Sequence, residues 1–530
     1  MKEQRTLARR IWVLLAVALF VLASCSQTGS PGKKGGTFVL GLVAEPTSLD
    51  PAQLTDINSM RILSSVYDTL VQFDASGFNL QPGLATKWTV SADGLTYTFD
   101  LRKGVKFHDG TAFNAQAVKF NFDRMLDPKN EFASTGPFPF AGFYYGAIKE
   151  TKVTDDNTVQ LILSKAYSPL LNSLTLNQGR IVSPAAVKKY GKDFAQNPVG
   201  TGPFKFSEWQ HGVRVVVTRN DEYWDGAPLL DKIVFRPIPD EQTRYTELKS
   251  GNADAIVDVP PDNVAQVKSD SKFQYVAQAG PHIWWITLNV AKAPLSDVRV
   301  RQALTYAINR DSIANDILKG TGTAASGAIP PAIGWAYTSS VTKYPYDPAK
   351  AKQLLSDAGF PNGLSLTFWV PESGSGMQSP KTMATAIQGD LAKVGVKVDL
   401  KTFEWGAYLT KYNAGFGKDA DMGAMSFMLD PGDPAPYLGL VIDSSALAPN
   451  GFNAGGYSSP IVDDLLKKAI ATTDQAERGK LYQQLDQQMT KDVPWIFVDN
   501  AIQNAAVSTK IHDFKLHPSF YIFFTKIWTD

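Results

Sequence analysis

Two aspartates flank a Pro-Gly dipeptide at the end of an apolar run, in the segment MSFMLDPGDPAPYLG at residues 425–439. Carboxylates this close together could form an acid–base pair, bind a metal ion or anchor a cationic ligand. Pro and Gly also favour a turn, which the carboxylates would then only stabilise. The residues alone leave Asp430 and Asp433 open among these four roles.

Residues that could complete a catalytic or metal site are scattered. The sequence contains no GxSxG, GxxxxGK[ST] or HExxH motif, and none of its five histidines has another three or four residues away. We therefore expect no catalytic residue, no bound metal, no cofactor and no enzyme activity, although residues far apart in the sequence could still come together to form a catalytic site. His108, in VKFHDG, is expected to stabilise a turn, while His512 and His517 are expected at the surface.

The single cysteine, Cys25, follows an export signal. A basic stretch, MKEQRTLARR, precedes roughly 13 apolar residues from Ile11 to Ala23, fewer than the ~20 that span a bilayer and typical of a secretory signal peptide. The segment LASC, which ends at Cys25, resembles a bacterial lipoprotein cleavage box. We expect a lipoprotein signal peptide over 1–24 and lipidation of Cys25; an ordinary signal peptide and an uncleaved anchor are the alternatives.

The segment after the cysteine and the overall composition describe an exported globular protein. Residues 25–36 are rich in Gly and Ser and predict a flexible, lipid-anchored tether. The 530 residues exceed what one core supports, and 44% hydrophobic with 19% charged residues indicates a globular chain. A net charge of +1 gives no basic field for nucleic acid. We expect a monomer, anchored to a membrane in the periplasm or at the cell surface, with no nucleic-acid partner.

Strand and helix patterns alternate along the rest of the chain. A helix is predicted after Asp347, which can cap it, and another from Ser379 and Pro380 to Gly395. Alternating apolar residues predict strands at 96–101, 158–163, 213–218 and 396–403. Such a mixture over this length predicts an α/β protein with large lobes.

Four long segments carry a resemblance to a known family. They are LQPGLATKWTVSADGLTYTFDLRKGVKFHDGTAFNAQAVKFNFDR (80–124), NPVGTGPF (197–204), NDEYWDGAPLLDKIVFR (220–236) and PLSDVRVRQALTYAINRDSI (294–313). In this order they resemble the extracellular solute-binding proteins of ABC importers, family 5, the peptide- and nickel-binding family, and within it the dipeptide-binding proteins. The resemblance extends from about Gly36 to the end of the chain.

The resemblance implies a function and its partners. Such a protein captures a di- or oligopeptide, or a peptide-like ligand, and delivers it to ABC permease and ATPase subunits for ATP-driven uptake. Another solute, such as a chelated metal, an opine-like conjugate or a sugar, is the alternative within the family. A secreted hydrolase and a peptide sensor are alternatives of other classes.

The family fold implies two lobes that close on the ligand about a hinge. The chain would cross between the lobes near IWWITLN and PWIFVDN, two apolar extended runs. The two-lobed periplasmic-binding-protein fold would then divide into lobe I at 36–285 and 498–530, with an extra subdomain at 88–198, and lobe II at 289–496.

The resemblance also assigns the two aspartates different roles. In peptide-binding members, an aspartate in the position of Asp430 receives the ammonium group of the peptide, whereas Asp433, before a proline, is expected to stabilise the turn. The ligand pocket would further contain Trp285, Trp405 and Phe427, although core packing explains each of these three equally well.

One position departs from the dipeptide-binding pattern. Those members carry an arginine for the peptide carboxylate near the position of Gly374, but the segment VPESGSGMQSPK at 370–381 contains none. Ser373, Ser375 and the backbone N–H groups of this glycine-rich loop could bind an anion instead. Alternatively, the ligand has no free carboxylate at this place.

Overall fold

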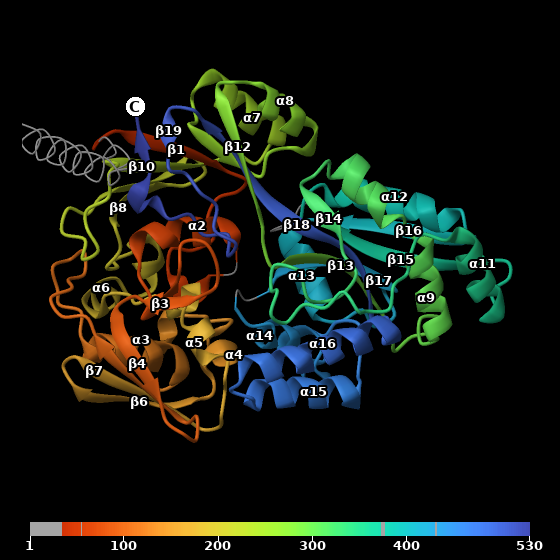
Figure 1. Ribbon diagram of the computed structural model, residues 1–530, viewed down its shortest axis with the longest axis horizontal. Helices are drawn as coiled ribbons and strands as arrows, with labels where there is room; N and C mark the ends of the chain where they lie inside the picture. The colour runs from red at the N-terminus through yellow and green to blue at the C-terminus, as the bar shows by residue number, and fades with distance from the viewer. Residues whose placement is uncertain (1–33, 55, 373–376, 430–431) are drawn as a thin grey trace, which may run out of the picture.

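The computed structural model describes residues 34–54, 56–372, 377–429 and 432–530 (Figure 1). Four predicted functional residues therefore lie outside the described residues: Cys25, Ser373, Ser375 and Asp430. The same holds for Gly374, where the expected arginine is missing, for the signal peptide and for most of the tether. Within the described ranges, no helix has both the length and the hydropathy needed to cross a membrane.

A twelve-stranded mixed sheet extends through the whole molecule, and its longest strand, β18 (Trp495–Ser508), belongs to both halves. The beginning of β18 pairs with β13 (His282–Leu288), and its end pairs with β11 (Ala255–Val257) and β12 (Phe273–Ala279). Because β12 leads almost directly into β13, the chain passes between the halves twice, at this junction and within β18. Figure 1 shows β18 running from one half to the other. We call these halves lobe I and lobe II.

Lobe I is built around the end of β18. Its strand β1 (Thr37–Leu42) lies in parallel between β10 and β11, so that Phe38 and Leu40 are fully buried in one core. The remaining elements are α2 (Ile57–Val66), β2 (Val71–Phe73), β3 (Leu80–Pro82), α6 (Pro184–Tyr190), β8 (Phe204–Gln210), β9 (Arg214–Arg219), β10 (Lys232–Pro237), α7 (Glu241–Ser250), α8 (Val264–Ser269), β19 (Ile511–His512) and β20 (Trp528–Thr529).

A separate four-stranded antiparallel sheet, in the order β4-β5-β7-β6, adds a second core to lobe I. Figure 1 places this sheet at the lower edge of the lobe, away from the large sheet. Its elements are β4 (Ala85–Val90), β5 (Thr96–Leu101), α3 (Ala115–Leu126), α4 (Ala141–Tyr145), β6 (Ile148–Asp155), β7 (Thr158–Leu163) and α5 (Leu170–Ser173).

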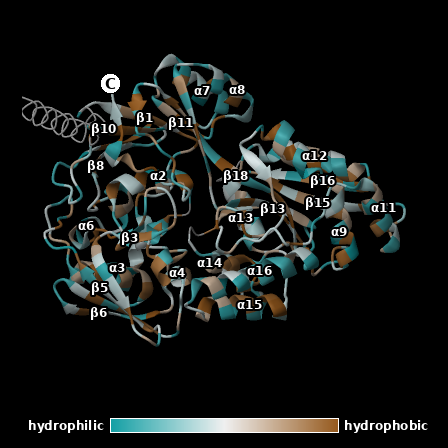
Figure 2. Ribbon diagram, in the orientation of Figure 1, coloured by the Kyte–Doolittle hydropathy of each residue, from teal (hydrophilic) through white to brown (hydrophobic). Residues whose placement is uncertain are grey.

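Lobe II packs helices on both faces of its part of the sheet, with one buried cluster on each side. Figure 2 shows hydrophobic and hydrophilic residues alternating along helices such as α9, as expected for helices with one buried face. The elements are α9 (Val298–Ala307), α10 (Arg310–Ser312), β14 (Gly322–Ala324), α11 (Pro348–Asp357), β15 (Leu364–Pro371), α12 (Pro380–Ala392), β16 (Val396–Phe403), α13 (Trp405–Asn413), β17 (Met422–Met428), α14 (Ala435–Val441), α15 (Pro460–Ala471) and α16 (Gln475–Asp492).

The predicted elements agree with the structure. Strands β5, β7 and β16 occupy the predicted residues, and β9 is displaced by one residue. Asp347 caps α11 by accepting a hydrogen bond from the backbone N–H of Lys350 at 2.9 Å. The two-lobed α/β fold is therefore confirmed, while the residue bounds assigned to the lobes and to the extra subdomain remain predictions.

Candidate functional site

A cavity of about 400 Å³ lies between the two lobes. Lobe I contributes side chains from α2, from α4 and from the turn at Asn177–Gly179. Lobe II contributes side chains from β13, β17, α13 and α14. The volume falls within the range of about 300–1,000 Å³ that is usual for small-molecule sites. A ligand here would contact both lobes, as closure of one lobe on the other requires.

Aromatic rings that reach the cavity from lobe II are also part of the core of that lobe. Trp285 on β13 is fully buried and stacks on Trp495 with ring centroids 4.5 Å apart. Phe427 on β17 stacks on Tyr437 at 4.9 Å. The Nε1–H of Trp285 donates to the hydroxyl of Thr287 at 2.8 Å. Since these rings are fixed by their neighbours, they form a rigid wall.

Helix α13 presents one stripe of side chains to the cavity. Trp405, Leu409 and Asn413 follow one another at four-residue spacing and all line it. The carboxylate of Glu404 caps this helix by accepting the backbone N–H of Ala407 at 3.0 Å. The cap determines the residue at which α13 begins. It therefore also determines which face of the helix points into the cavity.

Hydrogen bonds within lobe I hold the polar side chains of the opposite wall. The amide oxygen of Asn177 accepts from Nε of Arg180 at 3.0 Å, and the amide nitrogen of Gln178 donates to the carbonyl of Leu54 at 3.3 Å. Tyr521 lies on the same wall and donates to a backbone carbonyl 3.2 Å away. This wall was not predicted from the sequence.

The described lining of the cavity contains little charge. Asp56 is its only acidic residue, and Lys and Arg are absent from this part of the lining. The carboxylate of Asp56 accepts hydrogen bonds from the backbone N–H of Ser59 at 2.8 Å and from the hydroxyl of Thr47 at 2.6 Å. His282 also borders the cavity, and burial lowers its pKa to about 4, so its ring is neutral at physiological pH.

The structure brings three of the predicted ligand-binding residues together. Trp285, Trp405 and Phe427 come from β13, α13 and β17 and line the same cavity. Their contact with a ligand remains a prediction, since the packing described above would also account for Trp285 and Phe427. Asp430 lies outside the described residues, shortly after the cavity-lining Met428 in the chain.

The prediction that Asp433 stabilises the turn is confirmed. Its carboxylate accepts the backbone N–H of Ala435 at 3.0 Å, at the start of α14. It also pairs with Arg478 at 2.8 Å and accepts the hydroxyl of Tyr482 at 2.6 Å, both from α16. Asp433 is fully buried, and this burial raises its pKa although Arg478 lowers it. The aspartate that follows Asp430 so closely is thus a structural link between α14 and α16.

The structure tests two predictions about histidines. The turn at His108 is stabilised by Asp109, whose carboxylate accepts the backbone N–H of Thr111 at 3.0 Å, whereas His108 reaches a distant segment, with its Nε2 2.9 Å from the carbonyl oxygen of Gly202. The prediction that His517 lies at the surface is wrong: the side chain is 1% exposed, and its Nε2 lies 2.8 Å from the carbonyl oxygen of Gly77. Within the described residues, no group of three or more His, Cys, Asp or Glu side chains could hold a metal.

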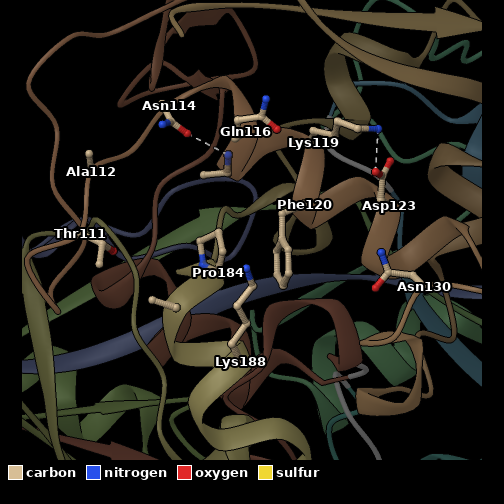
Figure 3. A pocket seen from close by; sticks show the side chains of 12 residues that line it. Thr111, Ala112, Asn114, Gln116, Lys119, Phe120, Asp123, Asn130, Pro184 and Lys188 are labelled. Atoms are coloured by element: carbon tan, nitrogen blue, oxygen red, sulfur yellow. Dashed lines mark hydrogen bonds and ion pairs between the residues drawn. The ribbon is translucent and has the colours of Figure 1, made fainter.

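A second hollow, of about 450 Å³, lies on lobe I between α3 and α6 (Figure 3). Lys119 and Asp123, which border it, pair with each other at 2.7 Å, and Asn114 caps α3. Its wall comes from one lobe only, so closure of the lobes could not enclose a ligand there. The cavity between the lobes is therefore the candidate ligand site.

Comparisons with known proteins identify the family of the chain. Residues 79–447 match the family described as bacterial extracellular solute-binding proteins, family 5 Middle. The chain is 35% identical to heme-binding protein A of Haemophilus influenzae, over 97% of this chain and 98% of that protein. It is 34% identical to the dipeptide-binding protein of Escherichia coli, over 94% and 95%. The solved structure of the ABC transporter-associated periplasmic binding protein DppA from Helicobacter pylori, in complex with the peptide STSA, has a TM-score of 0.84 and 32% identity, over 94% and 98%.

The fold and the site together define a class of protein. Two α/β lobes with a ligand-sized cavity between them are the architecture of periplasmic binding proteins, which capture solutes without transforming them. Within this class, the chain belongs to the bacterial extracellular solute-binding proteins of family 5, the binding subunits of ABC importers. The expected family is therefore confirmed, as is the expectation that the chain is not an enzyme.

Proposed function

We propose that this protein binds a short peptide in the cavity between its lobes and delivers it to the permease and ATPase subunits of an ABC importer. The observation that carries the proposal is a cavity of about 400 Å³ walled by both lobes. Further support comes from the relative named for dipeptide binding and from the relative solved with the peptide STSA.

Asp430 is the proposed anchor for the ammonium group of the peptide. It follows β17, whose last residues, Phe427 and Met428, line the cavity. Asp433, by contrast, is fully buried against Arg478 and has no access to a ligand. A charge-assisted hydrogen bond in a site shielded from water is strong, and losing one partner leaves the other buried and unpaired.

The proposal is tested by calorimetric titration with di- and tripeptides that have free, N-acetylated or C-amidated ends. We expect binding of free peptides, and a loss of roughly 2–5 kcal/mol both on N-acetylation and for Asp430→Asn, because either change removes the buried charge pair. Asp419→Asn, at an exposed position of lobe II, is the matched control and should bind like the wild type.

Different results would contradict different parts of the proposal. If no peptide binds, the peptide function is wrong, and heme, opine-like conjugates and chelated metals are the next ligands to titrate. Heme belongs in that series because one relative is named for heme binding and because aromatic rings line the cavity. If peptides bind but acetylation changes nothing, the role of Asp430 alone is wrong.

We further propose that Cys25 carries the lipid that anchors the protein outside the cytoplasm. The support is the position of the only cysteine directly after an apolar segment of export-signal length. In a bacterial host, the intact mass should show cleavage before Cys25 plus acyl chains, and Cys25→Ser should move the protein to the soluble fraction, whereas Ser26→Ala should not. An unacylated mature mass would indicate an ordinary signal peptide, and membrane-bound Cys25→Ser an uncleaved anchor.

A further inference from the structure

Among the residues that the structure describes, the lining of the cavity between the lobes offers no counter-charge to an acidic group of the ligand. Lys and Arg are absent from its described lining, and the one carboxylate there, that of Asp56, is negative and already accepts hydrogen bonds from Thr47 and Ser59. The ring of His282 is neutral at physiological pH because burial lowers its pKa to about 4. Neither of its nitrogens has a hydrogen-bond partner among the described residues, and both are buried.

Most of the remaining lining is apolar. Leu176 of lobe I lines the same cavity as Met425, Leu440 and Phe452 of lobe II. Placing a charged group in such surroundings costs its hydration without an ion pair in return. A neutral side chain would instead gain about 25 cal/mol for each Å² of apolar surface removed from water.

We infer that the ligand places a neutral, apolar side chain, aromatic or aliphatic, in this cavity and that the cavity excludes acidic side chains. This inference rests on the proposed peptide function and specifies the chemical class of peptide. The charged ends of the peptide are then held by other residues, of which Asp430 is the proposed one. Two features of the described lining therefore select the ligand. Its apolar side chains favour a neutral group, and its lack of Lys and Arg disfavours an acidic one.

A substitution on helix α13 can change which ligand side chains the cavity accepts. Leu409 lies in the middle of the stripe that faces the cavity, and it is partly exposed, so a longer side chain can be accommodated there. The next residue, Thr410, is exposed and does not line the cavity. Leu409→Lys therefore places a cation at the site, whereas Thr410→Lys adds the same charge to the same helix outside it.

The test is calorimetric titration of dipeptides in which alanine is combined, in either order, with Phe, Met, Lys or Glu. Met and Glu are similar in length, so their comparison keeps side-chain size nearly constant while the side chain changes from apolar and neutral to acidic. The wild type is expected to bind the Met peptide at least about tenfold more tightly than the Glu peptide, with the Lys peptide between them. Leu409→Lys should reduce the Met-to-Glu ratio by at least about tenfold, and Thr410→Lys should leave it unchanged.

Each contrary result has a separate meaning. If no peptide binds at all, the proposed peptide function is wrong, and the inference about the class of peptide is wrong with it. If peptides bind and the wild type does not distinguish Met from Glu, the inference is overturned while the function stands. Tightest binding of the Lys peptide would overturn it as well, since Asp56 would then act as a counter-charge. Should Leu409→Lys not fold, Asn413→Lys on the same stripe repeats the experiment.

Discussion

Three buried aspartates differ in what surrounds their carboxylates. The carboxylate of Asp433 is paired with Arg478, and that of Asp486 accepts the backbone N–H of Ala328 at 2.7 Å. One oxygen of Asp486 and one of Asp499 are buried without a hydrogen-bond partner among the described residues, and of these two only Asp486 has backbone hydrogen bonds that lower its pKa. Asp499 lies on β18 beside Gly322, near the point where this strand passes between the lobes. An unpaired carboxylate at this place weakens the fold when it is ionised.

The effect of Asp499 on stability depends on pH in a definite direction. Burial alone raises its pKa from 3.8 to about 7. Below about pH 3.8 the carboxyl is protonated in the folded and the unfolded chain, so it costs nothing. Between about pH 3.8 and 7 only the folded chain holds the proton, and the free energy of unfolding falls as the pH rises. Above about pH 7 the carboxyl is ionised in both states, and the folded chain bears the full free-energy cost of burying its charge.

Asp499→Asn should therefore stabilise the protein, and more so at high pH. Asparagine has the same size and no charge, so we expect a gain of at most about 4 kcal/mol at pH 8, the equivalent of the full shift, and almost none at pH 4. Thermal melts of wild type and variant between these pH values measure the difference. Asp419→Asn, which changes an exposed aspartate, is the control. An equal effect at both pH values would show that folding does not raise the pKa of Asp499.

At the scale of elements, the sequence correctly predicts helices and strands wherever a local pattern determines them. Strands β5 and β7 are predictable because one face of each is buried, so apolar residues alternate along them. Helix α11 is predictable because Asp347 and Pro348 define its start. Such signals lie within one element and do not depend on what packs against it.

The cavity could not be found in this way, because side chains from segments far apart in the sequence enclose it. Tyr144 and Tyr521 of lobe I line it together with Trp285 of lobe II, yet no local pattern separates these rings from core aromatics. All the cavity residues that the family resemblance indicated lie in lobe II of the structure, and it indicated none from the opposite wall, such as Tyr144 or Tyr521. His517 was misplaced for the same reason, since the packing of the C-terminal segment onto Gly77 is a long-range contact.

The whole molecule is held in its present form by contacts between the lobes as well as by the two connecting strands. Ser168 of lobe I donates its hydroxyl to the carbonyl of Ile470 at 2.9 Å, at the end of α15. Asn172 donates to the carbonyl of Gly432 at 3.3 Å. Ile470 itself packs against the core that surrounds the four-stranded sheet of lobe I. We call this set of contacts the interlobe latch.

The latch joins the two lobes close to the proposed ligand anchor. We therefore expect it to link closure of the lobes to retention of the ligand. Gly432, which Asn172 contacts, comes two residues after the proposed ammonium anchor, Asp430. Opening of the lobes would separate Ser168 and Asn172 from their partners, because the donors belong to lobe I and the acceptors to lobe II. We therefore expect the latch to stabilise the closed state and a bound ligand to leave mainly when the latch breaks.

Removal of the latch should accelerate release of the ligand. Each hydrogen bond contributes about 0.5–1.5 kcal/mol, so Ser168→Ala and Asn172→Ala should each raise the dissociation rate about 2- to 12-fold while changing the association rate less. Stopped-flow measurements with the peptide identified by calorimetry give both rates. Ser164→Ala is the matched control, because this nearby hydroxyl bonds to Ala147 within lobe I. If the latch variants slowed association and left dissociation unchanged, the contacts would form before the ligand is enclosed, and closure would not retain it.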